Sequence, residues 1–379
     1  MESEPSGLSD AHLITSFANY ANNTTLSALN ATRGDGSEMA FERLIRIIIP
    51  VIFGSICVLG FFGNLLVIIV ILTDKRMINT TNILILSLAV ADLLFIVFCV
   101  PFTATFYTLP VWPFGNVWCK MVIYLMYVCA YASMYSLVIM SFDRYLAVVH
   151  AIRSMTWRSE RNTWIIVAAI WIIFLAGNVP IFEQWDVHSY YFDGENRSKC
   201  LQVSLLHDGH KATAFFICFF FFGYVIPLGI TLLLYGLMLK RLLYGVVPGG
   251  RNQSSETMRA KKRVTRMVVI VVIIFALCWL PIQICLFLQH IIGMEVDVTM
   301  ASATIVANCL AYMNSCVNPI LYAFLSGNFR RSFRRFLCCS DRSQGMDYER
   351  TNIRINTREK DTNHTKSTCV DNSITYTSV

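Results

Sequence analysis

A single aspartate, Asp92, lies in the middle of the apolar run LSLAVADLLF. A charged carboxylate at the centre of a membrane helix costs about 2.5–3.5 kcal/mol even on lenient insertion scales, so this group needs partners. The candidates are oxygen-bearing side chains in two other apolar runs, Ser133, Asn314, Ser315 and Asn318. Such oxygens around one carboxylate suit a small hard cation, and sodium fits this set. The alternative is a protonated Asp92 that bonds to the same side chains with no ion bound.

An acid and a base stand together where the apolar run SLVIMSFDRYLAVVH ends, at Asp143 and Arg144, with Tyr145 beside them. An arginine at the end of a membrane helix can simply extend its charged head to the interface. The alternative is that Asp143 and Arg144 form a functional ion pair.

Prolines interrupt three apolar runs, at Pro227, Pro281 and Pro319. A proline inside a helix clashes with the carbonyl four residues earlier and bends the helix. Phe275 and Trp279 lie one turn apart just before Pro281, so a pivot there would move two large rings. Alone, these rings would be read as ordinary core aromatics.

The elements that hold these residues follow from the composition. Of the 379 residues 55% are hydrophobic and 15% are charged, which is too apolar for a soluble domain. A membrane helix needs about 20 consecutive apolar residues. Seven stretches qualify: 44–72, 83–107, 121–142, 164–182, 213–239, 267–289 and 299–325. The predicted fold is an all-α membrane protein, a seven-transmembrane helix bundle over residues 44–325.

The distribution of charge predicts the orientation. Lys and Arg gather at 75–76, 153–161 and 240–266, which marks these loops as cytoplasmic. The net charge of +7 then reflects a basic face against the lipid bilayer, and it does not imply nucleic acid. We expect a multi-pass plasma membrane protein with its N-terminus outside and its C-terminus in the cytoplasm.

The outer segments are predicted to be modified. Residues 1–43 form an extracellular, disordered tail with sequons at Asn22, Asn23 and Asn30, and Asn196 begins another outer sequon. Of 13 cysteines, only Cys119 and Cys200 fall on the oxidising side. We expect these two to form a disulfide, the alternative being two free thiols.

The C-terminal part is expected to lie on and beyond the inner membrane surface. Residues 326–337 alternate apolar Phe329, Phe333, Phe336 and Leu337 with arginines, the pattern of a short amphipathic eighth helix on the membrane. Cys338 and Cys339 are candidate palmitoylation sites. Residues 338–379 form a disordered tail, whose end, Thr377 to Val379, matches a weak PDZ ligand pattern.

Taken together, the motifs resemble those of rhodopsin-like G-protein-coupled receptors, each in the corresponding span. They are Gly63-Asn64, the LAVAD around Asp92, Asp143-Arg144-Tyr145, Trp171, Pro227, Cys278-Trp279-Leu280-Pro281 and Asn318-Pro319-Ile320-Leu321-Tyr322. The resemblance implies a receptor, not an enzyme, with heterotrimeric G proteins, arrestin and receptor kinases as partners.

The resemblance also implies roles for single residues. The activation switch would comprise Asp143, Arg144, Tyr145, Tyr235, Phe275, Trp279, Pro281, Asn318, Pro319 and Tyr322. G-protein contacts would be Arg144, Ile152, Lys261 and Lys262. The sequence departs from the family at the cytoplasmic start of span six, where no acid stands to pair with Arg144. Asp143 should therefore carry most of the restraint on this arginine.

The finer resemblance, carried by residues 131–162 and 311–333, is to allatostatin-A and galanin receptors, and it implies a neuropeptide ligand and the inhibitory class of G proteins. Met126 stands where amine, opioid and somatostatin-type receptors carry an Asp, which argues against a monoamine. Somatostatin, allatostatin-C or opioid-like peptides remain alternatives, and a transporter or channel is a remote one.

Helical spacing and this resemblance together give the expected ligand pocket. Its residues are Phe102, Phe106, Met126, Tyr127, Phe219, Ile282, Gln283, Leu286, His290, Thr304, Asn308 and Tyr312. The alternative for each is that it only packs against a neighbouring helix. The segment 183–211 is long enough to form a hairpin over the mouth of the pocket.

Overall fold

The computed structural model describes most of the chain between residue 35 and residue 333. The described ranges are 35–150, 152–192, 195–203, 209–244, 255–294, 298–325 and 329–333. The described residues between 35 and 325 belong to one compact unit, and residues 329–333, a short helical piece of a second unit, are described by themselves.

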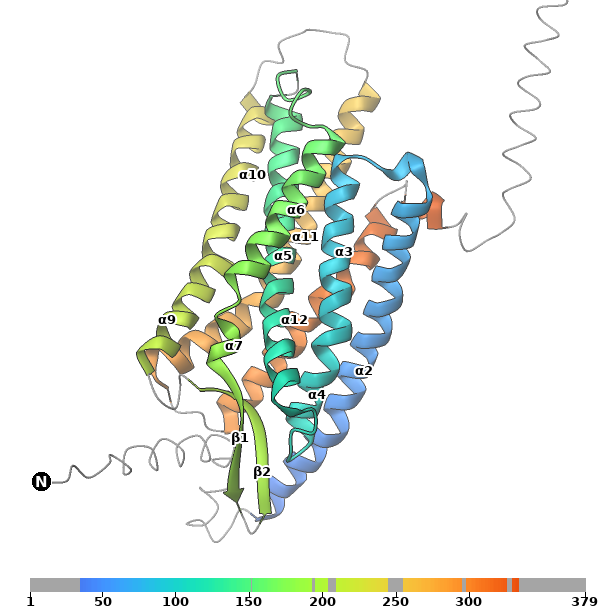
Figure 1. Ribbon diagram of the computed structural model, residues 1–379. Coiled ribbons are helices and arrows are strands. Elements are labelled where there is room, and N and C mark those ends of the chain that lie inside the picture. Colours follow the sequence, from blue (N-terminus) through green and yellow to red (C-terminus); the bar gives the residue numbers. More distant parts are fainter. Residues whose placement is uncertain are drawn as a thin grey trace, which may run out of the picture. The chain divides into compact units, whose positions relative to one another are not determined.

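Seven helical spans of the described part are long and apolar enough to cross a membrane, as the sequence predicts (Figure 1). The helices are α2 (Asp35–Thr73), α3 (Thr80–Phe98), α4 (Val100–Thr108), α5 (Gly115–Val149), α6 (Glu160–Gly177), α7 (Ile181–Gln184), α9 (Gly209–Phe220), α10 (Ile226–Tyr244), α11 (Ser255–Phe287) and α12 (Val298–Leu325). A 3-10 turn, η1 (Lys75–Met77), follows α2, and the π turns η2 (Phe221–Val225) and η3 (Leu288–Ile292) extend α9 and α11.

The second span is broken where the sequence predicts one helix. α3 ends at Phe98 and α4 begins at Val100, with Cys99 at the junction. Pro101 explains the break, because its ring clashes with the carbonyl four residues earlier and it has no N–H to donate. The carbonyl of Cys99, at the junction itself, accepts from the N–H and the hydroxyl of Thr103.

The fifth span contains a π turn just before Pro227. The N–H of Ile226 bonds to the carbonyl of Phe221, five residues back, instead of four. The hydroxyl of Tyr135 on α5 donates to the carbonyl of Phe222 at 3.1 Å. Such turns often accompany functional sites, because they rotate the side chains that follow them.

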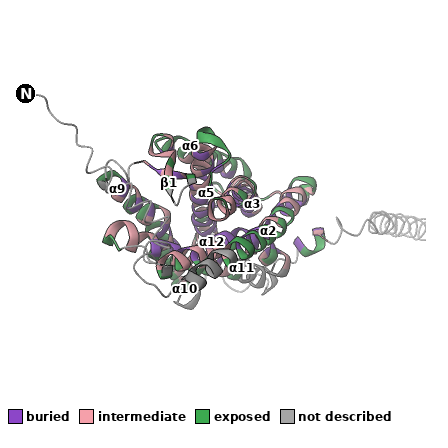
Figure 2. Ribbon diagram, turned by 90° about the horizontal axis from the view of Figure 1, so that it is seen from below, coloured by how far each residue is buried: buried purple, intermediate pink, exposed green. Residues whose placement is uncertain are grey.

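Close helix contacts form the interior of the bundle. Buried residues face inward on α5 and α12, and exposed ones cover the outer faces of α2, α6 and α10 (Figure 2). α2 comes so close to α12 that a Cβ on Gly63 would lie 3.1 Å from the ring of Pro319. Asn64 links the same helices, because its amide donates to the carbonyl of Ser315 at 2.9 Å.

A β-hairpin covers one end of the bundle, and the C-terminal end of α10 and the N-terminal end of α11 lie at the other end (Figure 1). Strand β1 (Trp185–Phe192) pairs antiparallel with β2 (Glu195–Gln202). The predicted disulfide is confirmed: Cys200 of β2 bonds to Cys119 near the start of α5. Lys199 adds a second anchor, since its ammonium donates to the carbonyls of Phe106 and Leu109, each at 2.7 Å.

Candidate functional site

A cavity of about 740 Å³ opens beneath the hairpin, between the helices. Its walls come from α3, α4, α5, α9, α11, η3 and α12, and its roof comes from β1 and β2. A volume of this size is typical of ligand-binding cavities in proteins.

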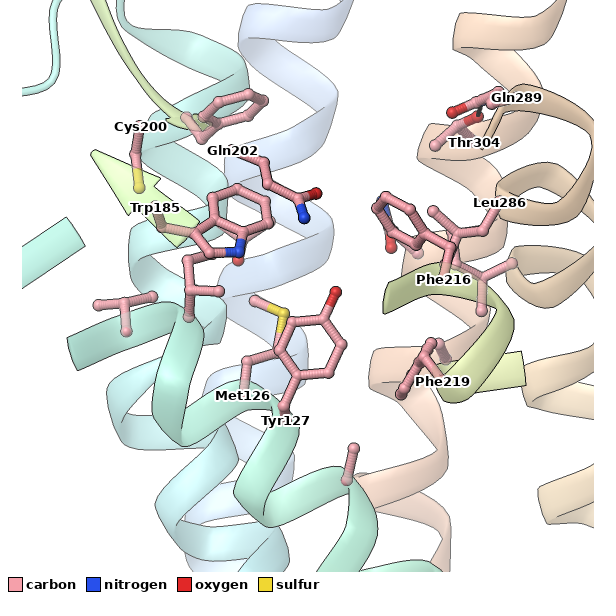
Figure 3. A pocket seen from close by; sticks show the side chains of 18 of the residues that line it. Met126, Tyr127, Trp185, Cys200, Gln202, Phe216, Phe219, Leu286, Gln289 and Thr304 are labelled. Atoms are coloured by element: carbon pink, nitrogen blue, oxygen red, sulfur yellow. Dashed lines mark hydrogen bonds between the residues drawn. The ribbon is translucent and has the colours of Figure 1, made fainter. Parts of the chain in front are cut away.

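The cavity gathers eleven of the twelve residues expected in the ligand pocket. They are Phe102, Phe106, Met126, Tyr127, Phe219, Ile282, Leu286, His290, Thr304, Asn308 and Tyr312. On the sixth and seventh spans, helical spacing therefore pointed to the face that lines the cavity, with one exception. Met126, Tyr127, Phe219, Leu286 and Thr304 can be seen around the space in Figure 3.

Gln283 is the exception, and the prediction that it lines the pocket is wrong. It is 1% exposed but does not line the cavity, whereas its neighbour Ile282 does. Consecutive residues of a helix point in directions roughly 100° apart, and on this turn of α11 it is Ile282 that points toward the cavity.

The cavity also contains residues that the sequence reasoning missed. They are mainly Thr103, Tyr107, Trp185, Gln202, Phe216 and Gln289. Two of them pair with expected residues: Asn308 donates to the hydroxyl of Tyr107 at 2.7 Å, and Gln289 donates to that of Thr304 at 2.7 Å. A helical period could have pointed to Thr103 and Tyr107, one turn apart on the second span. No local signal points to Trp185.

The lining is aromatic and uncharged. No Asp, Glu, Lys or Arg occurs among the described residues that line the cavity. Tyr127 meets Phe219 edge to face at 4.9 Å, and the ring of His290 stacks on Phe216 at 3.7 Å. The cavity is thus suited to an uncharged, largely apolar ligand group.

The floor of the cavity leads to the bend of α11. Trp279 lines the cavity and stacks on Phe275, one turn deeper, with ring centroids 5.7 Å apart. Pro281 lies inside the same helix, as Pro319 does inside α12. A ligand that presses on Trp279 would therefore act next to a proline bend.

Asp92 lies deeper still, at 1% exposure, among most of its expected partners. Ser133 and Ser315 donate to its Oδ1 at 3.1 and 3.0 Å, and Asn318 donates to its Oδ2 at 2.7 Å. Asn314 is not bonded to it. The Oδ1 of Asn314 is buried and has no hydrogen-bond partner in the described part of the chain.

At the opposite end of the bundle from the hairpin, Asp143 is 7% exposed and holds two guanidinium groups. Arg144 donates to its Oδ2. Arg158, in the segment between α5 and α6, donates from Nε to Oδ1 at 2.8 Å and from Nη2 to Oδ2 at 3.3 Å. The hydroxyl of Thr81 reaches Oδ2 at 3.3 Å. The sequence pattern predicts the pairing with Arg144 but not the pairing with Arg158.

The family "7 transmembrane receptor (rhodopsin family)" matches residues 63–322. The chain belongs to this receptor family. The receptor is 47% identical over 298 residues to the Allatostatin-A receptor of Bombyx mori, covering 79% of this chain and 81% of that one.

Two further relatives extend the comparison to galanin-type receptors. Identity to the Galanin-like G-protein coupled receptor npr-9 of Caenorhabditis elegans is 41% over 324 residues, covering 79% of this receptor and 75% of that one. Identity to human Galanin receptor type 1 is 36% over 319 residues, covering 81% and 87%.

Other predicted switch residues of the receptor lie in the half of the bundle away from the hairpin (Figure 1). Tyr235 accepts a bond from Ser141 at 3.4 Å, and Tyr322 is 1% exposed. Tyr145 does not join the pair it follows in sequence, since its hydroxyl meets His150 Nε2 at 3.4 Å. Ile152 is 82% exposed, as a protein-contact residue would be.

Several predictions concern residues or side chains outside the described part of the receptor. Among them are the sequons at Asn22, Asn23 and Asn30, the side chains of Lys261 and Lys262, Cys338, Cys339, Thr377 and Val379. Asn196 is described, and it is exposed on β2. Of the amphipathic segment 326–337, residues 329–333 are described as helical, with the rings of Phe329 and Phe333 5.7 Å apart. These assignments stay predictions.

Proposed function

We propose that the chain is a neuropeptide receptor of the allatostatin-A or galanin type, which passes extracellular binding on to a heterotrimeric G protein of the inhibitory class. The observation that carries the proposal is the uncharged, aromatic cavity beneath the hairpin. Its lack of a carboxylate disfavours an amine, whose ammonium would need a counter-ion. The names of the relatives support the peptide class.

The receptor would work by coupling the cavity to the helix bends below it. One end of the peptide fills the cavity, while the rest lies along the hairpin that roofs it. Contact with Trp279 moves the ring stack with Phe275 beside Pro281, so that α11 shifts at its far end. Arg144 then leaves Asp143 and becomes available to the G protein.

A peptide screen tests the proposal. Cells that express the receptor with a promiscuous G protein are exposed to a library of neuropeptides, monoamines and non-peptide ligands. We expect a response to allatostatin-A or galanin-like peptides. In cells that lack the promiscuous G protein and signal through their own inhibitory G proteins, pertussis toxin should block this response. A response to amines and to no peptide would refute the ligand class. A response only to somatostatin, allatostatin-C or opioid-like peptides would favour that alternative.

We place the receptor in the plasma membrane with its hairpin outside. The oxidised pair Cys119–Cys200 supports this side, because such bonds persist in oxidising compartments. Glycosidase treatment of intact cells should lower the apparent mass if the outer sequons, such as Asn196, carry glycans. An epitope at the N-terminus that antibodies detect only after permeabilisation would contradict the orientation.

We also propose that the Asp92 cluster binds sodium. The donor set fits, since two hydroxyls and a carboxamide surround the buried carboxylate and the Oδ1 of Asn314 offers a further unpartnered acceptor. Replacing NaCl by N-methyl-D-glucamine chloride should then strengthen agonist affinity about fivefold or more. Asp92→Asn should abolish this dependence. An unchanged sodium response in the variant would favour the protonated, ion-free carboxyl.

The cytoplasmic tail is proposed to engage arrestin, receptor kinases and a PDZ scaffold. The hydroxyl-rich sequence and the C-terminal Thr377 and Val379 support this. A pull-down with the tail peptide should recover a scaffold that is lost when one Ala is appended after Val379. Equal recovery by both peptides would remove the PDZ assignment.

A further inference from the structure

Two polar side chains face each other at the base of the hairpin, where it enters the bundle. Trp185 begins β1 and is the register partner of Gln202, which ends β2. Both line the cavity, and Gln202 is 1% exposed. Figure 3 shows the carboxamide of Gln202 and the indole of Trp185 extending side by side from the hairpin toward the space bordered by Phe216 and Leu286.

Each of these side chains retains one buried polar atom with no partner in the described part of the receptor. The Nε2 of Gln202 donates to Gln184 Oε1 at 3.2 Å, which leaves the Oε1 of Gln202 without a donor. The Nε1 of Trp185 has no acceptor. An unsatisfied buried group costs folding free energy, and a ligand that supplies the missing partner recovers it. The terminal torsion of a glutamine is soft, so a small rotation can present Oε1 to the ligand.

The surroundings restrict what that ligand group can be. The described cavity lining holds no charged side chain. The nearby cation Lys199 does not line the cavity, and its ammonium is already bonded to the carbonyls of Phe106 and Leu109. The group must therefore be uncharged, with an N–H for Gln202 and an acceptor for Trp185 side by side. An extended peptide residue directs its own N–H and C=O to the same edge. A primary carboxamide offers the same pair from one group.

We propose that Gln202 and Trp185 form an amide-recognition site. The Oε1 of Gln202 accepts a hydrogen bond from an amide N–H of the ligand, and the Nε1 of Trp185 donates one to an amide carbonyl. The inference rests on the proposed peptide function and names the residues that would distinguish a peptide from an apolar ligand of equal size. Through this pair, the roof of the cavity determines ligand specificity as the aromatic walls alone cannot.

An amide-to-ester scan tests the pair. The probe is a synthetic allatostatin-A-type peptide that activates the wild-type receptor, made as a series in which one N–H at a time is replaced by oxygen. In a second series, each primary carboxamide becomes a methyl ester. Both changes remove the donor and weaken the carbonyl as an acceptor. Binding of each analogue is measured on surface receptor of the wild type, Gln202→Met and Trp185→Phe.

We expect one analogue to bind the wild type about tenfold more weakly than the parent peptide. The same analogue and its parent should bind Gln202→Met within about twofold of each other, since the group that sensed the difference is gone. Trp185→Phe keeps an aromatic side chain but removes the N–H donor, so it should reduce the ratio of the two affinities for the same analogue. If the analogue that loses its penalty on Gln202→Met is a backbone ester, the site recognises an extended peptide residue. If it is a methyl ester of the second series, the site recognises a primary carboxamide.

Gln283→Met is the matched control. Gln283 is also 1% exposed and also has an unpartnered amide atom, but it does not line the cavity, so the tenfold ratio should persist. If Gln202→Met does not reach the surface, the ratio on Trp185→Phe decides. A tenfold ratio between parent and analogue that persists on every variant that still binds the peptide would overturn the amide site and leave the peptide function intact. No peptide response from the wild type would overturn both.

Discussion

Arg158 should ease the release of Arg144, although it is not part of the recognised motif. Both guanidinium groups bind the carboxylate of Asp143. When Arg144 leaves, Asp143 remains paired with Arg158. In an Arg158→Gln variant, the departure of Arg144 would leave the buried carboxylate of Asp143 without an ionic partner. The restrained state, in which Arg144 is bound to Asp143, should therefore become more stable relative to the released state.

The size of the effect follows from the burial of the pair. Breaking a fully buried ion pair costs about 3–5 kcal/mol, because one charge is left without a partner. The side chain of Asp143 is 8% exposed and that of Arg158 is 24% exposed, so water replaces part of the lost interaction. A value of about 1.5 kcal/mol remains, which is roughly tenfold in the equilibrium between restrained and released Arg144.

The assay is ligand-independent nucleotide exchange on the G protein in membranes with equal surface receptor. Arg158→Gln should lower this basal rate about tenfold, whereas Asp143→Asn should raise it, because that variant frees Arg144. Arg161→Gln, which removes the same charge from an exposed position nearby, controls for general effects on the basic face. A basal rate in Arg158→Gln that rises as it does in Asp143→Asn would refute the reasoning and make Arg158 a restraint.

Two further predictions concern stability. Burial, with the positive charges of Arg197 and Arg46 nearby, lowers the pKa of Lys199 to about 8. Between a pH of about 8 and the usual lysine pKa of about 10.4, the unfolded chain therefore binds more protons than the folded receptor, and stability increases with pH. The melting temperature of the purified receptor should rise over this range relative to that of Lys199→Met. A difference between the two melting temperatures that does not change with pH would contradict this. Gly60→Ala should destabilise the receptor by about 1–3 kcal/mol, because the added Cβ would lie 2.2 Å from the Cδ1 of buried Ile96. Gly54→Ala on the same helix has no atom within 4 Å to meet and should be neutral or stabilising, so equal melting temperatures for the two variants would count against close packing at Gly60.

The sequence itself determined the elements and their inner faces. Seven apolar stretches of membrane length must form helices, because the bilayer core has no water to hydrogen-bond to free backbone N–H and C=O groups. The compartment left Cys119 and Cys200 as the only pair that could oxidise, and the structure joins them. Likewise, a carboxylate as costly as Asp92 had to find polar partners, and three of its four expected ones bond to it.

Only the tertiary structure decided what reaches these sites from irregular segments and which of two adjacent residues faces inward. Arg158 meets Asp143 through a segment with no repeating period, so no spacing could place it there. Trp185 and Gln202 reach the cavity because a disulfide and the ammonium of Lys199 hold the hairpin over the bundle. Gln283 does not line the cavity although Ile282 and Leu286 of the same helix do, because a helical period gives the direction of a face only to within a residue.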